Sequence, residues 1–147
     1  MKKSLRAFCA VALSSMLLYI SCSKNSSVPS NVPFTIENLS GTYQLAALSW
    51  NYGGLNVNIY DSLDNCEKDN LTQLNTDKSF KLIDAGTVCT PPEDGDGTWD
   101  IKQDSLLFDT DYGHTKIESF DGTTLVLSGH PEGYEDVTAT VTFKKKL

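Results

Sequence analysis

Hydrophobic and polar residues alternate along most of the chain from Gly41 to Lys146, and the helical period of 3.6 residues does not recur there. In the clearest run, from Val137 to Phe143, every odd position is apolar and every even position is Thr. Such alternation is typical of a strand with one face in the core and the other in solvent. The pattern predicts eight or nine strands, at about 42–50, 55–61, 69–75, 78–84, 97–103, 105–109, 115–120, 123–128 and 136–145.

Turn signals separate these strands at short and fairly even intervals. Asp121-Gly122 predicts a two-residue hairpin loop of type I′, a turn whose central residues have positive φ. Only the connections around 61–68 and 86–96 are long, and 61–68 is the one place with room for a short helical turn. We therefore predict an all-β fold, an antiparallel up-and-down meander of about eight strands closed into a barrel, which leaves no open edges. The alternative is a β-sandwich, which would need longer crossover loops.

The first 21 residues have the pattern of an export signal. Residues 1–6 are basic, and Ala7 to Ile20 is mostly apolar and uncharged, shorter than the about 20 residues of a membrane-spanning helix. The segment 18–22 resembles a lipobox, in which Cys22 receives the diacylglycerol of a bacterial lipoprotein, although Tyr19 stands where Leu is usual. An ordinary signal peptide followed by a free Cys is the alternative. We expect a signal peptide at 1–21, lipidated Cys22 and a flexible tether at 22–35, and one folded domain at 36–147.

These features predict an exported protein, a bacterial outer-membrane lipoprotein on the periplasmic face or the cell surface. Loss of residues 1–21 removes three of the twelve basic residues and none of the nineteen acidic ones, so the net charge changes from −7 to −10. This charge argues against nucleic acid as a partner, since Lys and Arg must neutralise its phosphates. It also argues against adhesion to anionic lipid, so the lipid anchor would make the membrane contact.

Cys66 and Cys89 are the two cysteines expected in the folded domain. Because export implies an oxidising compartment, a disulfide between them is favoured over free thiols. Their spacing, without a nearby pair of His residues, does not match a zinc site. The acidic segment 93–97 that follows lacks the positions of a calcium loop, and we interpret it as a solvated turn.

We find no constellation of catalytic residues. The chain has no Gly-x-Ser-x-Gly, no His-Glu-x-x-His and no Gly-rich phosphate loop, and His114 and His130 stand alone. We therefore expect no enzyme, no cofactor and no metal site.

Short motifs give the chain a resemblance to a known family. Gly41-Thr42-Tyr43 and Gly97-Thr98-Trp99 each open an alternating run, and the segment 74–80 is a hairpin of the form apolar-x-x-Asp-x-x-Phe. With the flanking cysteines, the whole of 40–146 resembles the lipocalin-like domains of small bacterial lipoproteins. Two positions depart from the pattern. Lys78 stands where Gly is usual, which favours another turn geometry, and Tyr43 replaces the usual Trp.

The resemblance implies a barrel that is closed at the end where the Gly-Thr-aromatic residues pack, with a possible small apolar ligand at the other end. The residues expected to point inward, as core or as pocket, are Tyr43, Leu45, Ala47, Phe80, Leu82, Trp99, Ile101, Leu106, Phe108, Leu125, Leu127, Val141 and Phe143. Trp50 is expected at the barrel mouth, as a ligand contact or as a cover of the core edge. The candidate ligand-binding residues are thus Tyr43, Trp50, Phe80, Trp99 and Phe108.

Two functions remain open from the sequence. One is a lipid-anchored binding module for a small apolar ligand. The other is a protein-interaction module, an inhibitor or accessory subunit for an envelope protein, with a solid barrel and functional loops. An eight-stranded barrel can either fill itself with side chains or hold one small ligand, so an interior cavity would distinguish the two.

Overall fold

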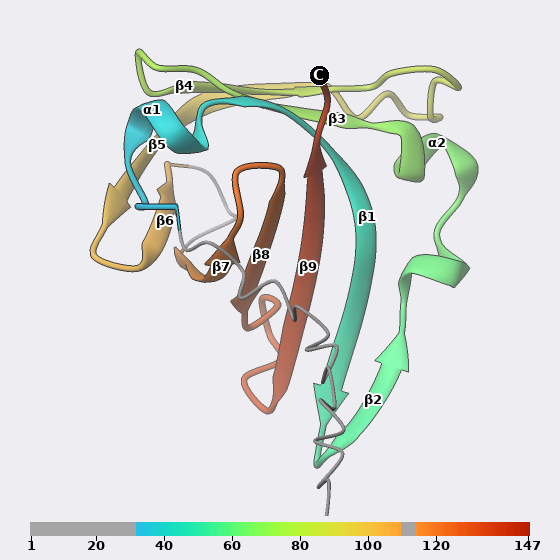
Figure 1. Ribbon diagram of the computed structural model, residues 1–147. Helices are drawn as coiled ribbons and strands as arrows, with labels where there is room; N and C mark the ends of the chain where they lie inside the picture. The colour runs from blue at the N-terminus through green and yellow to red at the C-terminus, as the bar shows by residue number, and fades with distance from the viewer. Residues whose placement is uncertain (1–31, 110–113) are drawn as a thin grey trace, which may run out of the picture.

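The computed structural model describes residues 32–109 and 114–147 and contains one antiparallel sheet. Its strands are β1 (Gly41–Tyr52), β2 (Leu55–Asn58), β3 (Leu71–Leu74), β4 (Ser79–Ile83), β5 (Gly95–Lys102), β6 (Ser105–Phe108), β7 (His114–Phe120), β8 (Thr124–Gly129) and β9 (Val137–Lys145). From β3 onward each strand pairs with the next, and β1 pairs with both β3 and β9. The β1–β9 pairing closes eight strands into a barrel (Figure 1). The predicted closed meander is therefore confirmed, and the sandwich alternative is wrong.

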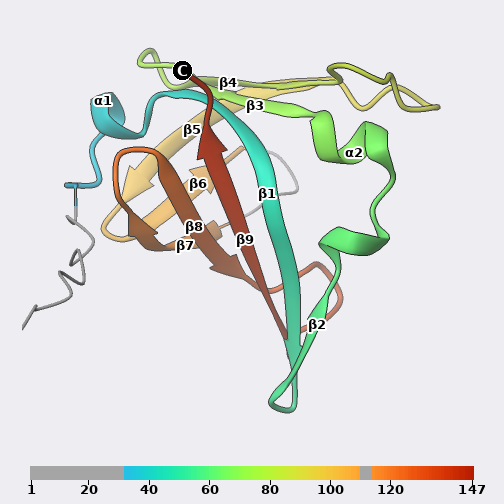
Figure 2. The same ribbon diagram turned by 45° about the vertical axis from the view of Figure 1, so that its right-hand side comes forward.

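One of the nine strands, β2, lies outside the barrel wall. It pairs only with the last residues of β1, and this hairpin extends past the end of the barrel that lies away from α1 (Figures 1 and 2). All four β2 residues are exposed, Leu55 by 72% and Val57 by 52%. The expectation that one face of this strand packs in the core was wrong, because alternation predicts a strand but not a core beside it.

Three short helices complete the described chain: α1 (Ile36–Leu39), the 3₁₀-helix η1 (Tyr60–Ser62) and α2 (Asn65–Asp69). The last two lie in the long connection before β3, where a helical turn was expected. A reciprocal capping box between Asp64 and Glu67 starts α2. In the described part of the chain, no helix has both the length and the hydrophobicity that a membrane span requires.

One end of the barrel is closed by α1 and a cluster of buried side chains. Leu39 is fully buried, and the Tyr43 hydroxyl donates a hydrogen bond to its carbonyl at 2.7 Å. Lys145 places its Nζ atom over the rings of Tyr43 and Phe120, 5.7 and 5.9 Å from their centroids. Buried Trp99 donates from Nε1 to the Asn75 carbonyl at 3.0 Å. The Gly-Thr-aromatic segments thus meet at the closed end, as the resemblance implied.

The segment before α1 also packs on this end. Val32 and Phe34 lie against the core, and the Val32 N–H donates to the Phe120 carbonyl at 3.3 Å. These residues belong to the stretch 22–35 that the sequence assigned to a tether. Cys22 and the signal segment 1–21 lie outside the described residues.

A β-bulge in β1 changes which side chains face the interior. Leu45 pairs with Phe143 and Ala47 with Thr142, so Ala46 is the extra residue. Because side chains alternate along a strand, one extra residue moves the inward positions from odd to even numbers. Ala47 is consequently exposed, against our expectation, and Trp50 turns toward the interior.

Two turns differ from the sequence expectations. Lys78 keeps the left-handed geometry usual for Gly, with φ of 68°, where another geometry was expected. At Asp121-Gly122 only Gly122 has positive φ, so the hairpin is present but its predicted type I′ turn is not. The Asp121 carboxylate instead accepts from the backbone N–H groups of Thr123 and Thr124, at 2.8 and 2.6 Å.

Candidate ligand-binding site inside the barrel

The barrel encloses a cavity of about 500 Å³. This volume lies within the range of about 300–1,000 Å³ that is usual for small-molecule sites. The cavity also reaches solvent, because exposed Glu93, His130 and Glu132 help to line it. Most of the wall is apolar, formed by Leu45, Leu74, Leu82, Leu106, Leu125, Leu127, Ala139, Val141 and Phe143 together with four further aromatic residues.

Those four aromatic residues, Tyr43, Trp50, Phe80 and Phe108, were all among the candidate ligand contacts. Phe80 and Phe108 meet edge to face with ring centroids 5.2 Å apart. Burial raises the pKa of Tyr43 to about 12, so its hydroxyl stays protonated and engaged with Leu39. The fifth candidate, Trp99, does not line this cavity and lies in the core of the closed end.

Trp50 belongs to the open end of the barrel. Its ring lies 5.8 Å from that of Tyr134, a half-exposed residue of the 130–136 loop between β8 and β9. The bulge at Ala46 brings Trp50 into the cavity wall. Simple alternation along β1 would have pointed this side chain outward, so the sequence could not predict its orientation. This pair joins β1 to the loop that borders the cavity.

One part of the wall is polar and comes from α2 and the 84–94 loop. Glu67, Asn70 and Glu93 line the cavity there, and we call these three residues the acceptor cluster. Asn70 is only 9% exposed and donates from Nδ2 to Glu93 Oε2 at 2.9 Å. Its Oδ1 atom is buried with no hydrogen-bond partner among the described residues. A buried acceptor left unpaired costs about 1–3 kcal/mol, so a ligand donor here would gain a prepared partner.

The predicted disulfide between Cys66 and Cys89 is present and joins α2 to the 84–94 loop. Asp84 organises the same loop, since its carboxylate accepts from the N–H groups of Cys89 and Glu93 at 3.0–3.1 Å. Segment 93–97 was expected to be a solvated turn. Glu93 is exposed, but the disulfide and the Asp84 hydrogen bonds also hold it in the cavity wall.

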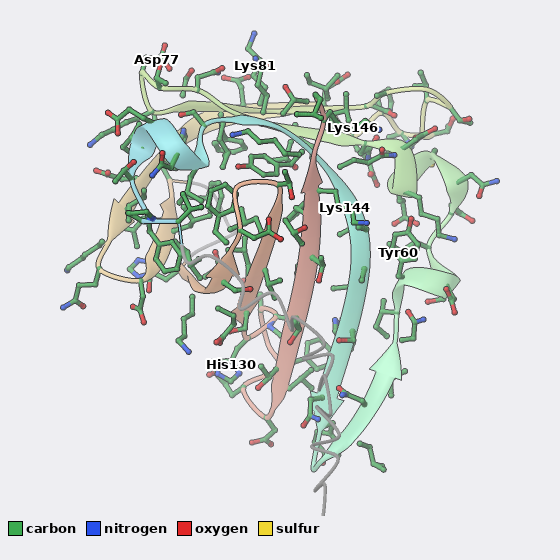
Figure 3. All side chains as sticks on the ribbon, in the orientation of Figure 1. Tyr60, Asp77, Lys81, His130, Lys144 and Lys146 are labelled. Atoms are coloured by element: carbon green, nitrogen blue, oxygen red, sulfur yellow. A yellow bond between two sulfur atoms is a disulfide. The ribbon has the colours of Figure 1, made fainter. Side chains whose placement is uncertain are left out.

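Across the barrel, β7 and the 130–136 loop supply further polar groups. Thr115 lines the cavity, and its buried Oγ1 atom has no partner in the described part of the chain. His130, at the barrel end away from Asp77 and Lys81, has its Nδ1 atom 2.8 Å from the Val137 carbonyl (Figure 3). Among residues 32–109 and 114–147, no three His, Cys, Asp or Glu side chains gather closely enough to hold a metal ion.

Comparison with known proteins identifies the fold family. The family model described as a lipocalin-like domain matches residues 39–127, more than half of the chain. The chain belongs to the lipocalin-like family. This lipocalin-like protein is also similar in structure to Japanin from Rhipicephalus appendiculatus, solved bound to cholesterol, with 15% sequence identity and a TM-score of 0.43. That likeness covers 77% of the present chain and 79% of Japanin. No curated protein matches the lipocalin-like protein in sequence.

Proposed function

We propose that this lipocalin-like protein is a non-enzymatic binding module that holds a small apolar ligand inside its barrel. The observation that carries the proposal is the cavity of about 500 Å³ with a mostly apolar wall. A solid barrel would have buried these side chains against one another, whereas here they face a space that reaches solvent. Removing apolar ligand surface from water contributes about 25 cal/mol per Å², which favours an apolar occupant.

We also propose that the protein is anchored to the bacterial cell envelope through lipid on Cys22. The support is the sequence alone, namely the basic and apolar segment 1–20 and the lipobox-like residues before the cysteine. Mass spectrometry of the mature N-terminus tests this proposal. We expect a diacylglyceryl group on Cys22 and its loss in a Cys22→Ser variant. An unmodified Cys22 in the wild type would contradict the lipid anchor.

Binding can be measured with N-phenyl-1-naphthylamine, a neutral apolar dye whose fluorescence rises in an apolar site. We expect saturable binding of one dye molecule per chain. Because Trp50 lines the cavity and Trp99 does not, Trp50 should report the same event. Quenching of Trp emission by the bound dye should therefore be smaller in Trp50→Phe.

A cavity-filling variant provides the control for this assay. Val141→Trp places a large side chain in the cavity and should weaken dye binding. Thr140→Trp, one residue earlier on β9, has the opposite orientation and should bind like the wild type. Equal binding by both variants, or no binding by the wild type, would contradict an interior ligand site.

A second function, a protein-interaction module for an envelope partner, is favoured by one observation. Tyr52, Leu55 and Val57 expose large apolar side chains on the hairpin of β1 and β2. Leu55→Ser/Val57→Ser should leave dye binding intact because neither residue lines the cavity. If the wild type captures a specific envelope protein and this variant does not, the hairpin is an interaction surface.

A further inference from the structure

The cavity wall combines apolar side chains with hydrogen-bond acceptors, and it lacks positive charge. Glu67, Glu93 and Glu132 all line it, from α2, the 84–94 loop and the 130–136 loop. No Lys or Arg is among the described residues that line the cavity. The ion pairs found in the described part of the chain, Lys78–Asp100 and Lys116–Glu118, leave these three glutamates out.

Asn70 supplies a hydrogen-bond acceptor in addition to the three glutamates. A carboxylate can only accept, so the contact with Glu93 fixes the amide with Nδ2 toward that residue. The Oδ1 atom is then left buried and unpartnered among the described residues, in a side chain nine-tenths buried in the cavity wall. A hydrogen-bond donor, from a ligand or from water, is what completes this amide.

His130 adds a further acceptor by the same logic. The Val137 carbonyl can only accept, so the Nδ1 atom of His130 must carry the hydrogen in their 2.8 Å contact. In the neutral imidazole, Nε2 is then an acceptor. The aromatic ring of Trp50 in the same wall offers a negative π-face, which also attracts cations.

We propose that the cavity selects ligands with an apolar body and a positively charged, hydrogen-bond-donating end, such as an alkyl or aryl ammonium group, which the acceptor cluster receives. This inference rests on the proposed function and specifies its ligand class. An ammonium group donates to Asn70 Oδ1 and is attracted by Glu67 and Glu93. A carboxylate end would instead meet acceptors and like charge.

The disulfide has a role in this selectivity. Glu67 follows Cys66 directly, while Glu93 lies four residues after Cys89. The covalent link between the two cysteines thus holds both glutamates on the same part of the wall, beside Asn70. Binding therefore requires little reorganisation of the acceptor cluster, which favours affinity.

Displacement of N-phenyl-1-naphthylamine from the purified chain at pH 7 and low salt tests the selectivity. The competitors are decylammonium, decanol and decanoate, which share one alkyl chain and differ in the charge of the end group. We expect decylammonium to bind at least about tenfold more tightly than decanoate, with decanol between them. Added salt should reduce the difference by screening, a readout that needs no variant.

The variant Glu67→Gln/Glu93→Gln removes two charges and retains the carbonyl oxygens that accept from Asp64 and Asn70. It should lower the affinity for decylammonium toward that for decanol. The control Glu37→Gln/Glu135→Gln changes the net charge equally at residues outside the cavity and should keep the preference. Equal affinities for the three competitors, or tighter binding of decanoate, would overturn the inference and leave the proposed function standing. Failure of the dye and all three competitors to bind would overturn the proposed function itself.

Discussion

At the scale of single residues, the closed end depends on a few polar groups inside an apolar cluster. Lys145 is the clearest case, because its stem covers the closed end and its ammonium group lies over two aromatic rings. The same group donates to the Asn38 carbonyl at 3.2 Å, which ties β9 to α1. The side chain therefore joins three parts of the fold through charge as well as through contact area.

Lys145→Met retains most of the stem and removes the charge. We expect it to lower the free energy of unfolding by about 1–2 kcal/mol, from the lost cation–π and hydrogen-bond contributions. Urea unfolding of the variant and of Lys144→Met, at the exposed neighbouring position, measures the effect. Equal unfolding midpoints for the two variants would show that the charge of Lys145 contributes nothing.

Asp121 gives the β7–β8 turn a pH dependence. Hydrogen bonds from the N–H groups of Thr124 and Thr123 lower the pKa of this carboxyl from 3.8 to about 2. Because the folded state lowers the pKa, the stabilisation is complete above pH 4 and is lost as the pH falls through about 2. We expect Asp121→Ala to unfold at lower urea than the wild type at pH 7, with a difference that shrinks between pH 4 and pH 2. A difference that is constant with pH would contradict the assignment.

At the scale of elements, the sequence predicts where the strands lie better than it predicts which of their side chains face the interior. All nine strands occur near their predicted positions, because period-2 alternation marks the clearest of them and turn residues bound the others. The bulge at Ala46 has no signal of its own, so Ala47 was placed inside while Trp50 could be placed only at the mouth. The acceptor cluster was missed for a related reason. Its members come from a helix, a strand boundary and a loop, and only the disulfide hints that these segments meet.

The Cys66–Cys89 disulfide is the element that should couple stability to selectivity. Cys66→Ser/Cys89→Ser should lose about 3 kcal/mol of unfolding free energy in the chain-entropy model for a loop of this length. The variant should also lose more affinity for decylammonium than for decanol, because the 84–94 loop is no longer held against α2. Calorimetry and dye displacement measure the two effects. An equal loss of affinity for both competitors would indicate that the disulfide supports the barrel without organising the acceptor cluster.

At the scale of the whole molecule, the barrel is closed and well packed at one end and hollow toward the other. The closed end holds Leu39, Tyr43 and Trp99 almost without exposure, whereas the cavity occupies the barrel beyond them. Under the proposed function, such a division places stability and binding in different layers of one fold. The wall around the cavity forgoes contacts that a filled core would have, and a bound ligand would supply those contacts.

Ligand binding and cavity filling should therefore be alternative ways to stabilise the molecule. A ligand that binds only the folded state should raise the unfolding free energy of the wild type by about 2.7 kcal/mol at about 100 times its Kd. Val141→Trp should unfold at a higher urea concentration than the wild type without ligand, because the indole occupies part of the cavity, and it should gain less than the wild type when ligand is added. Urea titrations with and without decanol measure both effects, and Thr140→Trp should retain the gain from ligand. A ligand-dependent gain in Val141→Trp equal to that of the wild type would place the binding site outside the barrel.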